Sequence, residues 1–281
     1  MNRTITSLLA AAGLVASAPA SAIIVGGVDF GALGADPTRT HLETATLAQT
    51  LVTGNGQNAT AYGFITTVNG DNTYCADGSG NCGLFYVANF NNSQNFSASY
   101  VEFTNTTVSV FFSDAAPPNL LSQNSPSNIA TIQGLNGGNP WVTLNGHNNL
   151  GGTADPAAVL NAVGLFTGGT LSGASFGLFD VSGPGDATVI NFLNANGVLD
   201  AAGGPTDIAL TASFNNNVLN PNDVSGGFSN GCQNGTAAAG AWCFEGTANL
   251  RGSTEIPEPG MLALVGTGLL GFGTAYRRRK A

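Results

Sequence analysis

Two histidines, His41 and His147, are the first candidates for general-base chemistry, and they lie in unrelated surroundings. A serine hydrolase would hold one of them beside a serine on a sharp turn. Ser79 lies between glycines inside a short segment bounded by cysteines, and Ser172 follows Leu171, so neither suggests such a turn. A zinc hydrolase would need His-Glu-x-x-His, which does not occur. We expect both histidines in turns or on the surface and assign no catalytic residue.

Paired carboxylates are the second chemistry to consider, because glycoside hydrolases place two of them about 5 to 10 Å apart. Glu102 and Glu245 are the most suggestive, since each lies in an apolar and aromatic stretch. Alternation along Val101, Glu102 and Phe103 predicts instead that Glu102 points to solvent. We therefore do not expect this chain to be an enzyme.

Four cysteines form two close pairs, Cys75 with Cys82 and Cys232 with Cys243. In an exported protein this spacing favours two local disulfides among three connectivities, and each would contribute about 2 to 3 kcal/mol by closing a Gly- and Asn-rich loop. Metal binding by four thiolates is disfavoured, because export keeps few thiols reduced.

Oxygen-bearing side chains at alternate positions make Asp77, Ser79 and Asn81 candidate ligands of a structural calcium ion. Residues 194–200 partly imitate a calcium loop as well. Neither pattern is complete, so ordinary Asx turns are the preferred interpretation and no cofactor is predicted.

The elements that would position these side chains are mostly strands, because β-branched and aromatic residues alternate with polar ones between Asn- and Gly-rich turns. The predicted strands are Ala45–Thr53, Ala61–Val68, Leu84–Phe90, Ser97–Phe112, Trp141–Leu144, Ser175–Val181, Ile208–Phe214 and Ala241–Leu250. Residues 105–107 are expected to make a short turn inside the fourth.

Two short helices are expected among the strands. Asp155 and Pro156 can start one that places Val159, Leu160, Val163 and Phe166 on one face, and Asp186 can cap another over residues 187–195, although residues 187–192 also fit a strand. Residues 117–138 are expected to form a surface excursion. The predicted fold is mainly β, a jelly-roll-like β-sandwich with one or two short helices; a parallel β-solenoid is the alternative, but no repeat of fixed length supports it.

Residues 1–22 have the composition of a secretory signal peptide. Arg3 gives a positive start, residues 8–15 are apolar, and Ala20 and Ala22 are the small residues that precede a cleavage site. We predict cleavage after Ala22, leaving a body over residues 23–255.

The C-terminal residues 256–281 combine three features in order. Pro257, Glu258 and Pro259 precede the stretch Met261–Tyr276, whose sixteen uncharged residues fall just short of the roughly 17 to 25 that span a bilayer, and then come Arg277, Arg278, Arg279 and Lys280. By the positive-inside rule this basic end stays cytoplasmic. We expect a signal helix at the N-terminus and a single transmembrane helix here.

This tail closely resembles the PEP-CTERM sorting tail of Gram-negative bacteria that make exopolysaccharide. The resemblance implies that an exosortase recognises Pro257, Glu258 and Pro259, that the apolar stretch anchors the chain transiently in the inner membrane, and that Arg277–Lys280 retain it there. The same tail is sometimes called an ice-binding-protein C-terminal domain. Thr60, Thr66, Thr67, Thr104, Thr106 and Thr107 form no regular array of the kind that ice binding needs, so that name describes only the tail.

The body between the two ends is acidic and nearly free of cations. Residues 23–254 contain fourteen acidic residues and only two cationic ones, Arg39 and Arg251, and no lysine. Such a charge repels nucleic acid, anionic lipid and acidic polysaccharide unless divalent cations bridge them, and no nucleic-acid partner is predicted.

These observations predict an exported protein that signal peptidase and an exosortase process and that reaches the cell surface or extracellular matrix. The expected role is structural or adhesive, in a biofilm or floc, with exopolysaccharide as a partner. The alternative is a secreted carbohydrate-binding or carbohydrate-degrading domain, for which Trp141 and Trp242 are the aromatic residues to inspect.

Overall fold

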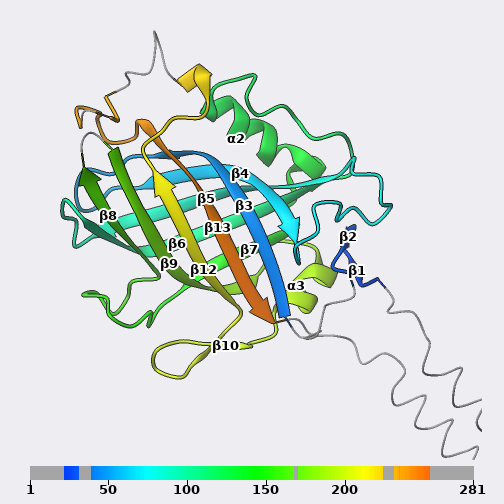
Figure 1. Cartoon of the computed structure of the whole chain (residues 1–281). Coiled ribbons are helices and arrows are strands. Elements are labelled where there is room, and N and C mark those ends of the chain that lie inside the picture. Colours follow the sequence, from blue (N-terminus) through cyan, green and yellow to red (C-terminus); the bar gives the residue numbers. More distant parts are fainter. Residues whose placement is uncertain (1–21, 32–38, 168–169, 224–230, 234, 254–281) are drawn as a thin grey trace, which may run out of the picture.

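Long antiparallel strands make up most of the chain that the computed structural model describes, which comprises residues 22–31, 39–167, 170–223, 231–233 and 235–253 (Figure 1). The strands are β1 (Ile24–Val25), β2 (Val28–Asp29), β3 (Arg39–Thr50), β4 (Ala59–Val68), β5 (Gly83–Gln94), β6 (Tyr100–Ser113), β7 (Val142–His147), β8 (Leu160–Thr167), β9 (Thr170–Ser182), β10 (Val198–Leu199), β11 (Pro205–Thr206), β12 (Ile208–Asn215) and β13 (Trp242–Ser253). The helical elements are α2 (Ser125–Gln133), η1 (Leu135–Gly138), α3 (Ala187–Leu193) and η2 (Pro221–Asp223).

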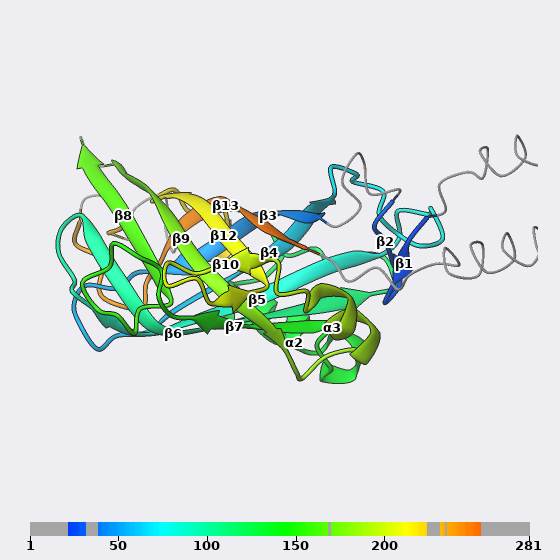
Figure 2. The ribbon, with the colours of Figure 1, turned by 90° about the horizontal axis from the view of Figure 1, so that it is seen from below.

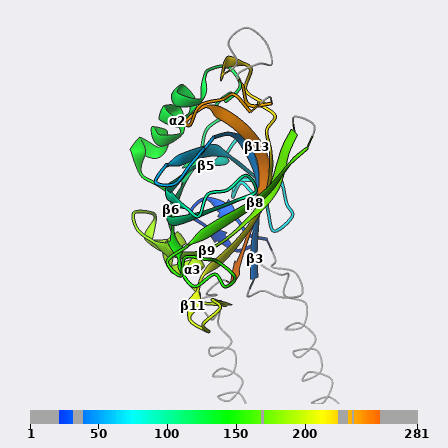
Figure 3. The ribbon, with the colours of Figure 1, turned by 90° about the vertical axis from the view of Figure 1, so that its left-hand side faces the viewer.

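Nine of these strands form one sheet that closes on itself. The order is β12-β13-β3-β4-β5-β6-β7-β9-β8, and two further pairings, β9 with β12 and β6 with β8, join its ends. β7 and β8 lie end to end between β6 and β9: the first part of β6 pairs with β8 and its middle with β7. The result is a barrel-like sheet of eight strand positions, visible as a ring of ribbons in Figure 3.

The prediction of a mainly β body with one or two short helices is confirmed, but the two-sheet sandwich is wrong. A jelly roll would divide the strands between two sheets, whereas here consecutive strands β3 to β6 pair as neighbours and β13 pairs with β3. Alternating side chains fit the inner and outer faces of a closed sheet as well as those of a sandwich. The alternation therefore could not distinguish the two architectures.

All eight predicted strands are present, with shifted ends. The expected turn at residues 105–107 is wrong, because β6 is continuous. Phe103 and Val108 nevertheless both face the interior although they are five residues apart, so the strand changes its inward-facing parity at this point. The break in the alternation near residues 105–107 thus reflects this change of face and not a turn.

One helix prediction is confirmed and one is wrong. Asp186 caps α3, accepting hydrogen bonds from the amides of Thr188 and Val189. The helix expected after Asp155 is instead the strand β8, whose register with β9 runs from Leu160 opposite Gly177 to Thr167 opposite Thr170. The surface excursion expected at residues 117–138 contains the helix α2.

One end of the sheet is closed by the N-terminal hairpin and α3, which lie close together in Figure 2. The Phe30 ring stacks beside the Trp141 ring at a centroid distance of 6.3 Å and meets Phe192 of α3 edge-on at 4.8 Å. The Trp141 indole donates a 2.8 Å hydrogen bond to the carbonyl of Gly26. Gly26 has a φ of +56°, and a Cβ there would lie 2.4 Å from the Trp141 ring nitrogen, so only glycine fits.

The helix α2 covers part of the outer face of the sheet. Tyr62 of β4 and Phe85 of β5 point outward into a second apolar cluster with Ile132 of α2. Beneath the helix, the Tyr62 hydroxyl accepts hydrogen bonds from Asn128 at 2.9 Å and Asn220 at 3.1 Å. β4 is thus buried on both faces, because Ala61 and Ile65 face the interior.

The close contact between β3 and β4 at Gly63 provides a test of this packing. A Cβ on Gly63 of β4 would lie 1.9 Å from the carbonyl oxygen of Ala45 in β3, where the pairing is irregular. We predict that Gly63→Ala lowers the free energy of unfolding by about 1 to 3 kcal/mol, the usual cost of overpacking. Gly54→Ala is the matched control, since the nearest atom to its Cβ would be 3.6 Å away. Thermal unfolding followed by circular dichroism measures both, and equal midpoints would contradict the packing described.

Candidate functional site

Glu102 is fully buried, contrary to the prediction that it points to solvent. Its carboxylate accepts hydrogen bonds from the Tyr100 hydroxyl at 2.5 Å, the Asn95 amide at 2.6 Å, and the backbone amides of Ala154 at 2.6 Å and Asp155 at 3.0 Å. Burial acts to raise the pKa of this carboxyl, but the four donors outweigh it and the pKa lies below its usual value. The carboxylate therefore holds the segment before β8 against β6.

Glu245 does not complete a catalytic pair with Glu102. It lies on β13, and β3, β4 and β5 separate that strand from β6 in the sheet. Because three strands, each about 4.8 Å from the next, separate β13 from β6 in a closed sheet of eight positions, the two carboxylates lie on opposite sides of it. They therefore do not face each other across one scissile bond. With its donors already in place, Glu102 is a structural anchor.

His147 lies between two carboxylates at the end of β7. Its Nδ1 is 2.9 Å from Asp180 and its Nε2 is 3.1 Å from Asp200, which also accepts a hydrogen bond from Asn149. Desolvation acts to lower the pKa of His147, but the hydrogen bonds and negative charges of the two carboxylates outweigh it and raise the pKa. The hydrogen bond from His147 is the main cause that lowers the pKa of Asp200 to about 2. Both ring nitrogens are thus engaged, as in a structural ion pair.

The Gly-x-Ser-x-Gly motif of serine hydrolases does occur in this chain, at two places other than Ser79 and Ser172. Residues 173–177 and 227–231 both read Gly-x-Ser-x-Gly, with Ser175 and Ser229 at the centre. Ser175 lies within the extended strand β9 and not on a strand-to-helix turn, and both nitrogens of His147 are bound to carboxylates. His41 contacts Asn249 at 2.7 Å. Ser229 lies outside the described residues.

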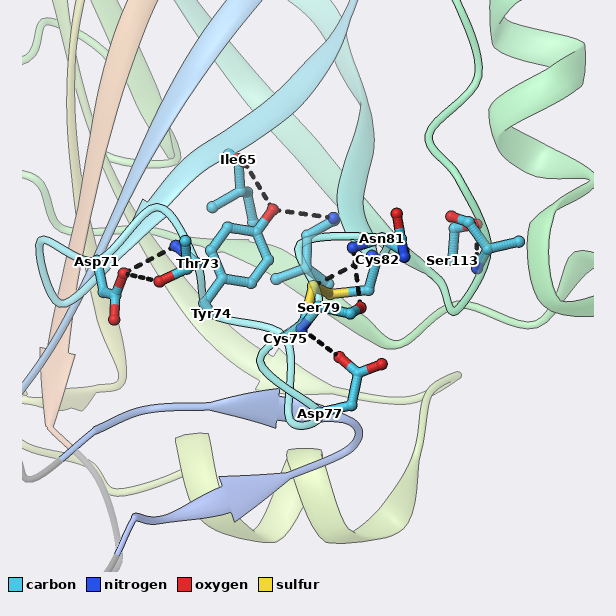
Figure 4. Close-up of a disulfide and its surroundings, with 12 residues drawn as sticks. Ile65, Asp71, Thr73, Tyr74, Cys75, Asp77, Ser79, Asn81, Cys82 and Ser113 are labelled. Carbon is cyan, nitrogen blue, oxygen red and sulfur yellow. Dashed lines mark hydrogen bonds between the residues drawn. A yellow bond between two sulfur atoms is a disulfide. The ribbon is translucent and has the colours of Figure 1, made fainter.

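The two local disulfides are present, joining Cys75 to Cys82 and Cys232 to Cys243. Figure 4 shows the first beside Tyr74, whose hydroxyl donates to the carbonyl of Ile65 and accepts from the amide of Leu84. Each disulfide closes a loop at the edge of the core, at opposite ends of the sheet. Cys232, Cys243 and Phe244 pack together in a third apolar cluster.

The calcium candidates Asp77, Ser79 and Asn81 form two successive turns inside the first disulfide loop (Figure 4). The Asp77 carboxylate accepts a 2.9 Å hydrogen bond from the amide of Ser79, and the Ser79 hydroxyl accepts one of 3.1 Å from the amide of Asn81. In the part of the chain that is described, no group of three or more His, Cys, Asp or Glu side chains is arranged to hold a metal ion. A calcium ion here stays an untested alternative to these turns.

The two tryptophans pack against other side chains. Trp141 is 3% exposed, and the half-buried Trp242 meets Tyr62 edge-on at a centroid distance of 5.9 Å. Trp141 therefore offers no exposed face to a sugar.

The interior of the sheet contains two adjoining cavities that the sequence did not indicate. The outer one has a volume of ≈ 170 Å³ and the inner one ≈ 70 Å³, and Gln49, Phe90, Leu160 and Ser175 line both. Inward-facing small residues on strands far apart in the sequence leave this space unfilled. The sequence positions of these small residues reveal the space only once the order of the strands in the closed sheet is known.

The predicted processing segments lie largely outside the described residues. Ala22 is described and Ala20 is not, nor are Pro257, Glu258, Pro259 or Arg277–Lys280. Among the described residues, none of the helices has the length and apolar character needed to cross a membrane. The division of the chain into residues 1–22, 23–255 and 256–281 stays a prediction.

Comparison with protein families identifies the class of the tail. The model of the PEP-CTERM protein-sorting motif matches residues 255–280, under a tenth of the chain, which therefore carries this motif. The motif implies an exported protein that an exosortase processes and whose C-terminal tail anchors it in a membrane beforehand. Searches of curated proteins and of solved structures found no match.

The His147 cluster predicts how stability depends on pH. Because the pKa of His147 is raised in the folded protein, the protonated ring stabilises the fold. This contribution is complete below the unfolded pKa of 6.5 and is lost as the pH rises through the folded pKa. Asp200 stabilises above its unfolded value of 3.8, and this contribution is lost as pH falls towards about 2. We predict that His147→Gln lowers the thermal midpoint more at about pH 5 than at about pH 8. An NMR titration of the His147 ring should give a pKa above 6.5, and a value at or below it would contradict the arrangement.

Proposed function

We propose that this chain is a non-enzymatic structural or adhesive protein of the cell surface or exopolysaccharide matrix, delivered there by exosortase processing. The observation that carries the proposal is the sorting motif at residues 255–280. Since the apolar tail anchors the chain before processing, cleavage near Pro257–Pro259 would release the body outside the inner membrane. A role in a biofilm or floc follows from delivery of the body to the matrix.

The outer face of β12 and β13 supports contact with polysaccharide. Along these strands Leu210 and Leu250 face the interior, whereas Thr211 and Thr247 face outward and are exposed. Ser213 hydrogen-bonds to Thr247 across the two strands at 3.0 Å. Figure 1 shows β12 and β13 on a face that α2 does not cover. Uncharged hydroxyl groups in this arrangement can exchange hydrogen bonds with sugar hydroxyls without the cost of desolvating charges.

A carbohydrate-degrading role has less support. Glu102 is saturated with hydrogen bonds, and Glu245 lies on the opposite side of the sheet. Carbohydrate contact without cleavage is compatible with the proposal and forms part of the adhesive role.

Sorting is tested by intact mass and cell fractionation of the mature protein from an exopolysaccharide-producing host, with and without its exosortase. We predict loss of residues 1–22 and of everything after about Pro259, exosortase dependence, and a mass four hydrogens below the reduced chain because of two disulfides. The Glu258→Ala variant should stay in the membrane fraction with its tail intact. A full-length C-terminus embedded stably in the inner membrane of the unmodified host would contradict the proposal.

The adhesive role is tested separately by co-sedimentation of the processed protein with the host's exopolysaccharide. Thr211→Glu combined with Thr247→Glu should weaken retention about fivefold, because two hydroxyl donors are replaced by charges that repel acidic polymer. Thr188→Glu adds a charge to the exposed face of α3 and should leave retention unchanged. Equal retention of all variants, or none by the unmodified protein with or without calcium, would contradict the role.

A further inference from the structure

The cavity inside the sheet reaches the surface at the end opposite α3. Its outer part is lined by the β5–β6 connection, where Ser97, Ala98 and Ser99 are exposed, and by Leu51 and Val52 just after β3. Figure 3 looks onto the side of the molecule where β6, β8 and β9 meet. The inner part of the cavity continues towards Leu193 of α3. The space is thus a pocket with one closed and one open end.

Two aromatic pairs face each other across the outer cavity. Phe90 of β5 and Phe103 of β6 lie with their ring centroids 5.6 Å apart, and Phe214 of β12 and Phe244 of β13 do so edge-on at 5.6 Å. β5 and β6 are on the opposite side of the closed sheet from β12 and β13. A flat apolar molecule between the pairs would therefore contact aromatic rings on both sides.

The space persists because small residues occupy inward positions. Ala61, Ala88, Ala212 and Ala248 line the inner cavity, and Ala162 lines the outer one. A closed sheet of eight strands has room either for large interior side chains or for one small ligand. Protein interiors otherwise pack with few voids larger than a water molecule, so a continuous space of this size calls for an occupant.

The lining has no charged side chain among the described residues that border either cavity. A charged ligand would lose its hydration there without gaining a counter-charge, which favours a neutral one. Polar groups are few. Thr46 and Tyr86 are hydrogen-bonded to each other at 2.6 Å, and burial raises the pKa of Tyr86 to about 12, so this phenol is also neutral.

Deeper than Ser97 and Ser99 at the exposed mouth, Gln49 and Ser175 are the polar side chains left for a ligand. They lie where the outer and inner cavities meet, and within the described part of the chain neither side chain has a hydrogen-bond partner. A carboxamide and a hydroxyl together offer both donors and an acceptor. A ligand carrying one hydroxyl or carbonyl group beside an apolar body would satisfy both.

We propose that this pocket binds a neutral, mainly apolar small molecule with a single aromatic ring or a short alkyl body and one hydroxyl or carbonyl group. The outer volume of ≈ 170 Å³ is comparable to an engineered apolar cavity of about 150 Å³ that binds benzene. The ring lies between the two phenylalanine pairs, and its polar group meets Gln49 and Ser175. The inference does not depend on the sorting or the matrix role.

Three single-ring ligands of similar size test the chemistry: benzyl alcohol, toluene and benzoate. Calorimetry with the processed protein should show saturable binding of benzyl alcohol, with toluene about fivefold weaker through loss of a hydrogen bond and benzoate at least about tenfold weaker through its charge. Gln49→Leu should remove most of the preference for benzyl alcohol over toluene. Absence of saturable binding for all three, or benzoate binding as tightly as benzyl alcohol, would overturn the proposal.

Variants that fill the pocket with a larger side chain provide a second test of the proposal. Ser175→Phe should abolish binding of benzyl alcohol, whereas Ser172→Phe adds the same ring to an exposed position of the same strand and should leave binding unchanged. Near-ultraviolet circular dichroism checks the fold of each variant. If Ser175→Phe does not fold, Ala162→Phe fills the outer cavity from β8 instead. Unchanged binding in a folded filling variant would show that the ligand binds elsewhere.

Discussion

Closure of the sheet by β9 and β12 is the constraint on which the rest of the structure depends. The eight paired positions from Ile208 opposite Phe179 to Asn215 opposite Ser172 join strands that would otherwise be two exposed edges. An open edge offers unpaired amides and carbonyls to any other chain, and closure removes that hazard. Closure also fixes which side chains share the interior, and so creates the cavity. For the same reason β4 has one face towards the interior and one towards α2, and Glu102 lies far around the sheet from Glu245.

Local patterns predicted the strands better than their arrangement. β-branched and aromatic alternation identified eight strands, because that signal depends only on which residues face a core. It failed at Leu160, Val163 and Phe166, whose spacing also fits one face of a helix. Pairing with Ser175 and Gly177 decides this segment in favour of a strand, and two glycines between Thr167 and Thr170 were the hairpin signal available in the sequence.

The chemistry of the candidate residues depends on contacts that no local pattern contains. Glu102 faces outward on its strand as alternation predicts, yet Ala154 and Asp155, more than fifty residues later, cover it. His147 meets Asp200 across a similar separation. The disulfides were predictable, because each pair is local and its loop short. The pocket was not, since alanines from β4, β5, β12 and β13 meet only in the closed sheet.

The position of β13 sets an order of events for a chain that crosses a membrane while unfolded. This strand lies between β3 and β12, so the first long strand of the sheet pairs with the last across about two hundred residues of sequence. Such non-local pairing is slow to form and has to wait until the whole chain is present. β13 ends at Ser253 and the sorting motif begins at residue 255. The body therefore completes its fold only when the anchoring tail has reached the membrane, which couples the end of folding to the arrival of that tail.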